Sequence, residues 1–320
     1  MPEKTDFTFR STDKKTEIHA IKVMPDGKPK AIVQLVHGMD EYIDRYDDFA
    51  DFLAQHGYLV IGHDHLGHGD TAATPEDFGY FAEGRGDITL VEDIHKLRLH
   101  TQDEPANADL PYFILGHSMG SYLLREYLGL YSDGLAGAII MGTGDVPDIS
   151  TDFGIFLCNA LARINGWRHR SLAIQSMTYT KSYKRYDVTG RDTSNSWLSK
   201  VPSVIEAYRG DPRCTFVFTL NGHLALFESV KAACSLKTIN SMAKDLPVLI
   251  VSGADDPVGD LGEGVKRVYD KFLGAGMEDV TMKLYENDRH EILHETDSDQ
   301  VYEDLLGWLD TKTEKAGQRL

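Results

Sequence analysis

Short apolar runs alternate with helical patterns at both ends of this chain, and the alternation limits the folds that it can adopt. Such a run between two helices is typical of a strand that is buried on both faces of a sheet. The pattern therefore predicts an α/β fold, a mostly parallel sheet with helices on both faces. Residues 17–23 alternate polar and apolar instead, so we expect a half-buried strand at the sheet edge. The apolar runs are 31–36, 58–61, 112–115, 135–141, 247–251 and 280–285, and the helical patterns are 44–55, 87–99, 119–131, 261–272 and 299–309.

The alternation stops near Gly144 and resumes near Leu246, and the segments between them look helical. We expect a discontinuous core of residues 1–144 and 244–320, with residues 145–243 inserted as a helical domain. A chain of 320 residues buries about three quarters of its surface, so its three cysteines are not needed as disulfides.

The charge balance excludes one large class of partners. The chain has 33 basic and 50 acidic side chains, a formal net charge of −17. Such a surface repels phosphate backbones, so we expect no nucleic-acid partner. The first residues are charged, and no apolar run approaches the ~18 residues of a membrane span. Together with the odd, scattered cysteines, this predicts a cytoplasmic protein.

One motif carries chemistry. Gly116-His117-Ser118-Met119-Gly120 matches G-x-S-x-G and lies between a predicted strand and a predicted helix. This is the context of a nucleophile elbow, in which two small glycines allow a sharp turn and leave the serine exposed. The positive end of the following helix then points at the Ser118 hydroxyl. We therefore predict that Ser118 is a catalytic nucleophile.

A serine nucleophile needs a base, and the base needs an orienting acid. Around such an elbow the acid follows a later strand and the histidine follows the last one. His290, after the run 280–285, is the candidate base. Asp256, after the run 247–251, is the candidate acid, with its neighbour Asp255 and the earlier Asp145 as alternatives.

Two backbone N–H groups should hold the negative oxygen that forms during acyl transfer. One should belong to Met119, directly after the nucleophile, and the other to Met39, in the loop after the run 31–36. His37, in the same loop, either braces that loop or is simply packed there.

Two histidine-rich stretches raise the alternative of a metal enzyme. His290 to His294 reads H-E-x-x-H, which on an α-helix would bind zinc with Glu291 as base. Its place after the last predicted strand, and the lack of an evident third ligand, favour a serine hydrolase instead. We interpret the second stretch, residues 63–68, as a strand exit whose polar side chains brace a loop. We expect no metal and, without a phosphate-binding glycine motif, no nucleotide cofactor.

These stretches together resemble the α/β-hydrolase superfamily, in the branch of monoacylglycerol lipases, bacterial lysophospholipases and serine aminopeptidase-type domains. The resemblance implies an α/β-hydrolase fold, a triad of Ser118, Asp256 and His290, and an oxyanion hole at Met39 and Met119. The family commonly has Arg where Leu66 stands, a departure that concerns a structural loop. The matching stretches are 37–42 (His-Gly-Met-Asp-Glu-Tyr), 45–46, 57–58, 64–69, 116–120, 252–258 and 289–291.

The resemblance also implies that residues 145–243 form a cap over the active site. Phe153, Phe156 and Leu157 then line an acyl-binding entrance, or else belong to the cap's own core. We expect a serine esterase acting on a small-molecule ester, a monoacylglycerol or lysophospholipid with one acyl chain. Such a lipid is compatible with transient contact with a membrane surface. The alternatives are an aminopeptidase or thioesterase on the same residues, a zinc protease, and a non-catalytic binding protein.

Overall fold

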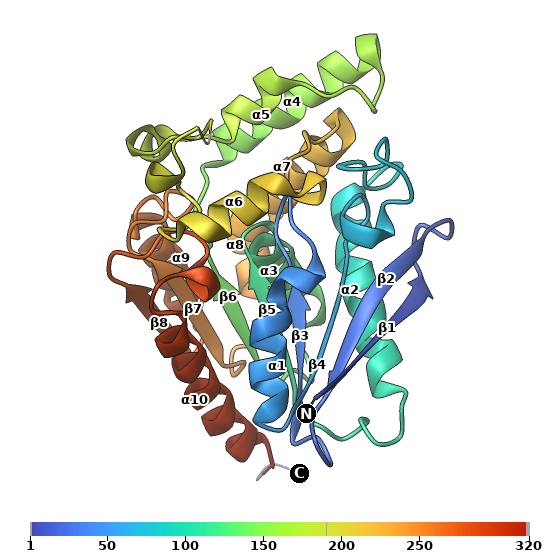
Figure 1. Cartoon of the computed structure of the whole chain (residues 1–320), viewed down its shortest axis with the longest axis vertical. Coiled ribbons are helices and arrows are strands. Elements are labelled where there is room, and N and C mark those ends of the chain that lie inside the picture. Colours follow the sequence, from blue (N-terminus) through green and yellow to red (C-terminus); the bar gives the residue numbers. More distant parts are fainter. Residues whose placement is uncertain (1, 190, 318–320) are drawn as a thin grey trace.

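The computed structural model describes residues 2–189 and 191–317 and contains a sheet of eight strands, with both termini at one end of the molecule (Figure 1). The strand order across the sheet is β1-β2-β4-β3-β5-β6-β7-β8. Pairs from β4 to β8 are parallel, whereas β1 and β2 are antiparallel to their neighbours. The prediction of a mostly parallel sheet is thereby confirmed. The strands are β1 (Glu3–Arg10), β2 (Glu17–Met24), β3 (Ala31–Val36), β4 (Tyr58–His63), β5 (Tyr112–His117), β6 (Gly137–Met141), β7 (Val248–Gly253) and β8 (Val280–Tyr285).

The prediction that residues 17–23 form an edge strand was wrong. They lie in β2, and β1 covers them on the outside along its whole length, from Glu3 opposite Met24 to Arg10 opposite Glu17. The sequence pattern missed β1 because its outer positions are charged and only Phe7 and Phe9 pack toward the core. An edge strand tolerates such charges, since one of its sides faces solvent.

Helices cover both faces of the sheet. On one face, α1 and α10 pack apolar side chains such as Leu53 and Leu305 against the strands. On the other face, α2, α3, α8 and α9 do the same with side chains such as Ile94, Leu124 and Phe272. The helices are α1 (Asp47–Gln55), α2 (Gly86–Gln102), α3 (Met119–Tyr131), α4 (Asp148–Asn165), α5 (Leu172–Met177), α6 (Pro202–Gly210), α7 (Leu220–Cys234), α8 (Leu236–Ser241), α9 (Glu263–Gly274) and α10 (Ser298–Gly317).

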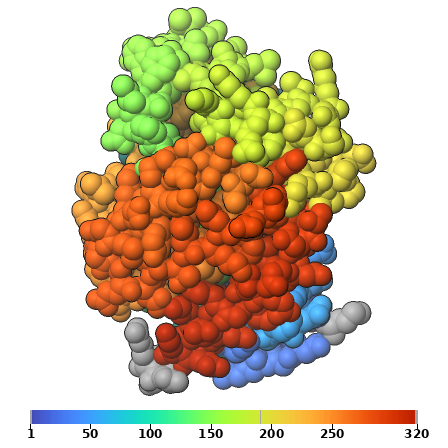
Figure 2. Space-filling model, turned by 90° about the vertical axis from the view of Figure 1, so that its left-hand side faces the viewer, coloured from blue at the N-terminus to red at the C-terminus, as the bar shows by residue number. Residues whose placement is uncertain are grey.

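The inserted segment lies above the carboxyl ends of the parallel strands. Figure 1 shows α4 and α5 farthest from the two termini, and Figure 2 shows the green-to-yellow insertion rising above the orange and red part of the core. Helix α4 packs along α7, whereas α7 and α8 also pack on the core helix α3. The end of the insertion is therefore fixed to the core, and its first helices rest on α7. A division of the chain at residues 145 and 243 remains a prediction.

Two further findings concern the cysteines and the possibility of a membrane span. The three cysteines, at positions 158, 214 and 234, are free thiols and buried. No helix in the described ranges is both long and apolar enough to cross a membrane.

Candidate active site

Ser118 sits at a sharp turn between β5 and α3. Its backbone is in an unusual conformation, with φ 54° and ψ −121°. A Cβ atom at Gly116 would lie 2.4 Å from the Gly120 carbonyl oxygen, and one at Gly120 would lie 2.1 Å from the Val36 carbonyl oxygen. Only glycine fits at either position, so both motif glycines are required by the turn itself. The strain at Ser118 is the kind that collects at functional sites.

Asp256 and His290 come together after β7 and β8. The Nδ1–H of His290 donates to Oδ2 of Asp256 at 2.9 Å, and both side chains are buried. Asp256 also accepts bonds from the Ser252 hydroxyl (3.0 Å) and the Val258 N–H (2.8 Å). Three donors hold the carboxylate in place, so the ring of His290 is fixed with Nε2 as its free nitrogen.

The two alternative acids lie elsewhere. Asp255 points toward Arg185 at the surface, with 3.5 Å between Oδ1 and the guanidinium nitrogen. Asp145 forms an ion pair with Lys271 at 2.5 Å. Neither is hydrogen-bonded to His290, so the structure favours Asp256 as the partner of His290.

The His290 ring is held between two other rings. The ring centroid of His117 lies 4.7 Å from that of His290, and the centroid of Trp197 lies 5.2 Å from it. Below the ring, Gly142 has φ 61°, and a Cβ atom there would lie 3.0 Å from Cε1 of His290. The space around the imidazole is therefore filled, which restricts its orientation.

The loop after β3 approaches the nucleophile closely. A Cβ atom at Gly38 would lie 2.8 Å from the Ser118 Cβ, so glycine is needed here as well. Within the described residues, neither the Met39 N–H nor the Met119 N–H donates a hydrogen bond to the rest of the chain. Both residues line the same cavity as Ser118. Two free N–H donors beside a serine are the requirement for an oxyanion hole.

A buried network anchored on Glu41 holds this loop. Its carboxylate accepts from the Gly38 N–H, the Tyr46 hydroxyl (2.9 Å) and Arg45 (3.1 Å), and it contacts His117 Nδ1 at 3.1 Å. Burial alone would raise the pKa of Glu41, but the bond and charge of His117 and the charge of Arg45 lower it to about 2. The carboxylate is thus ionised, and it links the loop to His117, whose ring lies beside that of His290.

Arg45 extends the network across the site. Its guanidinium donates to both oxygens of Glu291 (2.9 and 2.8 Å), the residue after His290. Glu41, Arg45 and Glu291 all lie in the family stretches, but the sequence indicated no role for Glu41 or Arg45, and for Glu291 only that of base in the zinc alternative. Their pairing joins residues far apart in sequence, so no local pattern reports it.

A segment of the insertion is bonded to the loop that carries His290. We call this segment, residues 194–200, the strap. It begins within the short 3₁₀ turn at Thr193–Asn195. The His290 N–H donates to the Trp197 carbonyl (3.4 Å), and the Glu291 N–H donates to the Leu198 carbonyl (2.7 Å). Further bonds join Arg289 to Ser196 and Ser199, and Lys200 to Asp288 and Glu295.

Ser118, His290, Met39 and Met119 line one cavity of about 690 Å³. One part of its wall is apolar and comes from the insertion, and another part is polar. Of the predicted acyl-binding residues, Phe153 lines this cavity, but Phe156 does not and is 65% exposed. Leu157 packs instead in the insertion's own apolar cluster with Phe227. The apolar lining that the sequence did not single out includes Val146, Met177, Leu226 and Val230.

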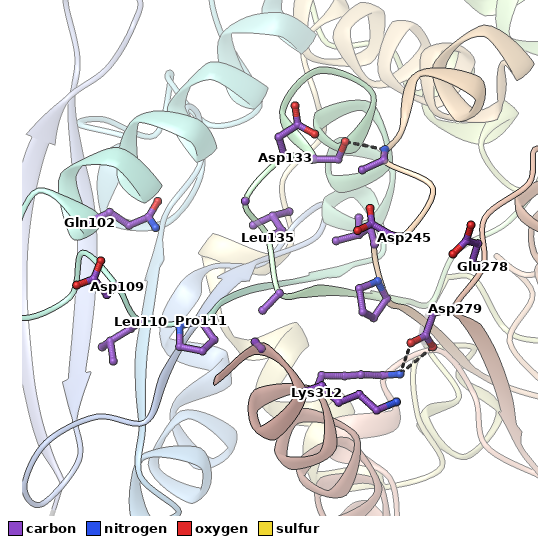
Figure 3. Close-up of a pocket in the computed structure, with 18 of the residues that line it drawn as sticks. Gln102, Asp109, Leu110, Pro111, Asp133, Leu135, Asp245, Glu278, Asp279 and Lys312 are labelled. Atoms are coloured by element: carbon purple, nitrogen blue, oxygen red, sulfur yellow. Dashed lines mark hydrogen bonds and ion pairs between the residues drawn. The ribbon is translucent and has the colours of Figure 1, made fainter. Parts of the chain in front are cut away.

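A second cavity, of about 760 Å³, lies at the opposite ends of the strands (Figure 3). Pro111, Pro247 and Asp279, which directly precede strands, line it. Lys312 donates to both oxygens of Asp279 (2.7 and 2.6 Å). The hydroxyl oxygen of Ser132 in this cavity accepts the Ala243 N–H at 2.9 Å, and no basic side chain in the described ranges is bonded to it. Ligands of parallel α/β sheets bind at the carboxyl ends of the strands, where Ser118 lies.

The geometry around residues 290–294 does not match that of an H-E-x-x-H zinc site. The H-E-x-x-H residues are not on an α-helix, since residues 292–294 form a single 3₁₀ turn. His290 is bonded to Asp256, Glu291 to Arg45, and the Nε2 of His294 contacts the Arg45 carbonyl oxygen at 3.0 Å. Within the described ranges, no three His, Cys, Asp or Glu side chains are grouped so as to hold a metal.

The second histidine-rich stretch packs beneath the loop after β3. Nε2 of His37 accepts the His65 N–H at 3.0 Å, so His37 braces that loop. Burial lowers the pKa of His37 to about 3 and that of His68 to about 4, so these rings are neutral. Asp64 accepts bonds from the N–H groups of Ile43 and Asp70, both at 2.8 Å.

Comparison with known proteins gives one family. The model of the family described as serine aminopeptidase, S33 (Hydrolase_4) matches residues 27–297. The chain is 26% identical over 311 residues to monoglyceride lipase of Rattus norvegicus, covering 92% of this chain and 87% of that one. It is 25% identical to monoacylglycerol lipase of Mycolicibacterium smegmatis, over 89% and 90% of the two chains. The crystal structure of a carboxyl esterase from Bacillus coagulans is similar, with a TM-score of 0.88, 27% identity and coverage of 97% and 99%.

Proposed function

Because this chain belongs to the serine aminopeptidase S33 family of α/β hydrolases, it is a carboxylic-ester hydrolase, and we propose that its substrates are lipids with one acyl chain. Monoacylglycerols and lysophospholipids are the two classes that fit. The observation that carries the proposal is the single cavity in which Ser118 and His290 meet an apolar wall. A lipid offers both parts that such a site needs, an ester carbonyl and an apolar chain.

In the proposed reaction, His290 Nε2 takes the proton of the Ser118 hydroxyl while the serine oxygen attacks the ester carbonyl. The Met39 and Met119 N–H groups hold the negative oxygen. His290 then gives the proton to the departing alcohol, and an acyl-serine remains. A water molecule, activated by the same nitrogen, releases the fatty acid. Asp256 keeps the proton of the neutral ring on Nδ1 and stabilises the imidazolium that forms.

The apolar wall of the cavity suits the acyl chain. Val146, Phe153, Leu226, Phe227 and Val230 line it, and they come from the insertion or from its junction with the core. Burying each methylene of a chain against such a wall contributes about 0.8 kcal/mol. This part of the chain, residues 145–243, therefore acts as a cap in the proposal.

The outer surface of α4 suits contact with a lipid surface. Ile149, Phe156 and Ile164 recur at helical spacing and are 79%, 65% and 82% exposed, and none of them lines the cavity. An apolar stripe of this kind lies flat in the headgroup region of a membrane. Figure 1 shows α4 at the end of the molecule farthest from the termini. We propose transient docking through this stripe, because a net charge of −17 gives no attraction to anionic lipids.

The first experiment is labelling with a fluorophosphonate, which reacts with activated serines. The wild type should be labelled, and Ser118→Ala should not. Ser150→Ala is the matched control, since Ser150 lines the same cavity without a histidine partner, and it should be labelled like the wild type. Labelling that survives in Ser118→Ala would refute the proposed nucleophile.

Turnover of matched substrates then separates the activities that share this chemistry. An ester, a thioester and an aminoacyl amide of equal chain length should be hydrolysed with the ester fastest. A faster aminoacyl amide would assign an aminopeptidase instead. No turnover by a labelled protein would leave the ester proposal without support.

A further inference from the structure

Asp40 is a carboxylic acid in the wall of the active-site cavity, directly after the proposed oxyanion donor Met39. Its backbone is left-handed, with φ 55°, a conformation that Asp, Asn and Gly tolerate best. Its Oδ1 atom is buried and has no hydrogen-bond partner in the part of the chain that the structure describes. A buried acceptor without a partner is rare, and it calls for a ligand or a function.

Asp40 has no ion-pair partner in the part of the chain that the structure describes. The charge of Glu41 opposes its ionisation, and the positive charge of Arg170 has a smaller, opposite effect. The guanidinium of Arg170 donates to backbone carbonyls, including those of Val217 and Glu76, rather than to a carboxylate. Burial, followed by the charge of Glu41, raises the pKa of Asp40 well above its ordinary value. The field at this position therefore opposes negative charge, including the charge of Asp40 itself.

Asp40 belongs to the polar part of the cavity wall. Tyr179, Tyr208 and Arg45 line the cavity too, and the pKa values of both tyrosines are raised by burial and then by the charge of Asp40. The apolar lining residues named above come from the insertion. An ester whose acyl chain packs on them has its alcohol half left to contact polar lining residues such as Asp40.

We propose that Asp40 reads the alcohol half of the substrate, accepting hydrogen bonds from the hydroxyls of a neutral polyol such as a glyceryl group. The inference rests on the proposed ester hydrolysis and narrows its substrate class to monoacylglycerols. A glyceryl ester has two free hydroxyls, and either one satisfies the buried Oδ1. A lysophospholipid keeps one free glyceryl hydroxyl, but its phosphate brings a negative charge close to Asp40, where burial and the charge of Glu41 already oppose one.

The proposed discrimination between esters rests on the free-energy cost of leaving a buried polar group without a hydrogen bond. A site built to bond a hydroxyl discriminates against an analogue without it, because the buried polar group is then left unpaired. An alkyl ester without hydroxyls offers no donor to Oδ1. The glyceryl ester donates to Oδ1 in both the bound state and the transition state.

The test compares three esters of one acyl chain: the glyceryl ester, the methyl ester and the lysophosphatidylcholine, each below its micellar concentration. The measured quantity is the ratio of kcat/KM for the glyceryl ester to that for each of the other two. In the wild type both ratios should be well above one. In Asp40→Gly, which fits the backbone angle, each ratio should fall about tenfold. In Asp40→Asn, which keeps an acceptor oxygen, the ratio to the methyl ester should stay within about threefold of the wild type.

Lys14→Gly is the matched control. Lys14 has a similar left-handed backbone angle, φ 64°, but it is exposed and does not line the cavity. Its ratios should match those of the wild type. Ratios that do not change in Asp40→Gly, or that change equally in Lys14→Gly, would overturn the assignment of Asp40. A wild type that hydrolyses none of the three esters would instead refute the proposed function, and the inference with it.

Discussion

Gly142 lies under the imidazole of His290, and replacing it with alanine tests how closely the ring must be held. The residue has φ 61°, so an alanine there costs about 1–2 kcal/mol of stability in backbone strain alone. The new Cβ would lie 3.0 Å from Cε1 of His290, 3.1 Å from Cδ2 of His117 and 3.2 Å from Nδ1 of His290. These contacts are shorter than ordinary van der Waals contact, so the rings must move by a few tenths of an ångström.

The His290 ring has little room for that movement. Asp256 holds Nδ1 at 2.9 Å, and the Trp197 ring lies against the ring at a centroid distance of 5.2 Å. A misplacement of about 1 Å costs a catalytic group roughly 10²-fold in rate, so a smaller displacement should lower kcat about tenfold. KM should change little, because the apolar wall is untouched.

The assay is steady-state ester hydrolysis together with urea unfolding, for Gly142→Ala and for Gly27→Ala. Gly27 has φ 92° and nothing within 4 Å of its virtual Cβ, so its alanine variant carries the backbone cost without the contact. Both variants should lose similar stability, but only Gly142→Ala should lose kcat. Equal kcat values in the two variants would show that the contact with His290 has no catalytic consequence.

Three further predictions follow from the same contacts. Asp256→Asn should lower kcat by about 10³- to 10⁴-fold with the fold intact, whereas the kcat of Asp255→Asn should stay within about threefold of the wild type. Similar decreases in kcat in both variants would refute the choice of Asp256 as the acid. Arg45→Ala removes the guanidinium that pairs with the buried carboxylates of Glu41 and Glu291. Urea unfolding should show that the free energy of unfolding falls by about 3 kcal/mol, and a decrease below about 1 kcal/mol would contradict the network. Burial, with the charge of Asp87, raises the pKa of Glu126 from 4.5 to about 8, so the folded protein binds a proton that the unfolded chain has released. Stability should therefore fall as pH rises from 5 to 8. Glu126→Gln should reduce the difference between the urea midpoints measured at pH 5 and at pH 8. An unchanged difference would show that Glu126 does not cause the pH dependence of stability.

The turns that follow strands could be predicted because their requirements are local. Ser118, Asp256 and His290 each follow a strand at a position that the chain order of the fold specifies. The glycines around Ser118 are there because the backbone leaves no space for a Cβ, which a sequence pattern can report. The alternation of strands and helices is equally local, and it correctly predicted the parallel strands β3 to β8.

The features that were missed depend on contacts between distant residues. β1 was not predicted because its charges conceal a pattern in which only Phe7 and Phe9 pack inward. Phe156 and Leu157 have the apolar character expected of a pocket, but the rotation of α4 leaves one exposed and buries the other among helices. Trp197 reaches His290 across 93 positions of sequence, and nothing near either residue indicates the contact.

The strap divides the insertion into parts with different freedom. Residues 194–200 are bonded to the loop of the catalytic base, and α7 is packed on the core helix α3. A displacement of either would move the imidazole or disrupt the core. The α4–α5 hairpin, residues 148–177, has neither of these contacts, and Arg168 and Arg170 bind it instead to the core loop at residues 75–77. Exchanging α4 while keeping these two arginines would therefore alter the proposed acyl-binding wall and leave the imidazole of His290 in place.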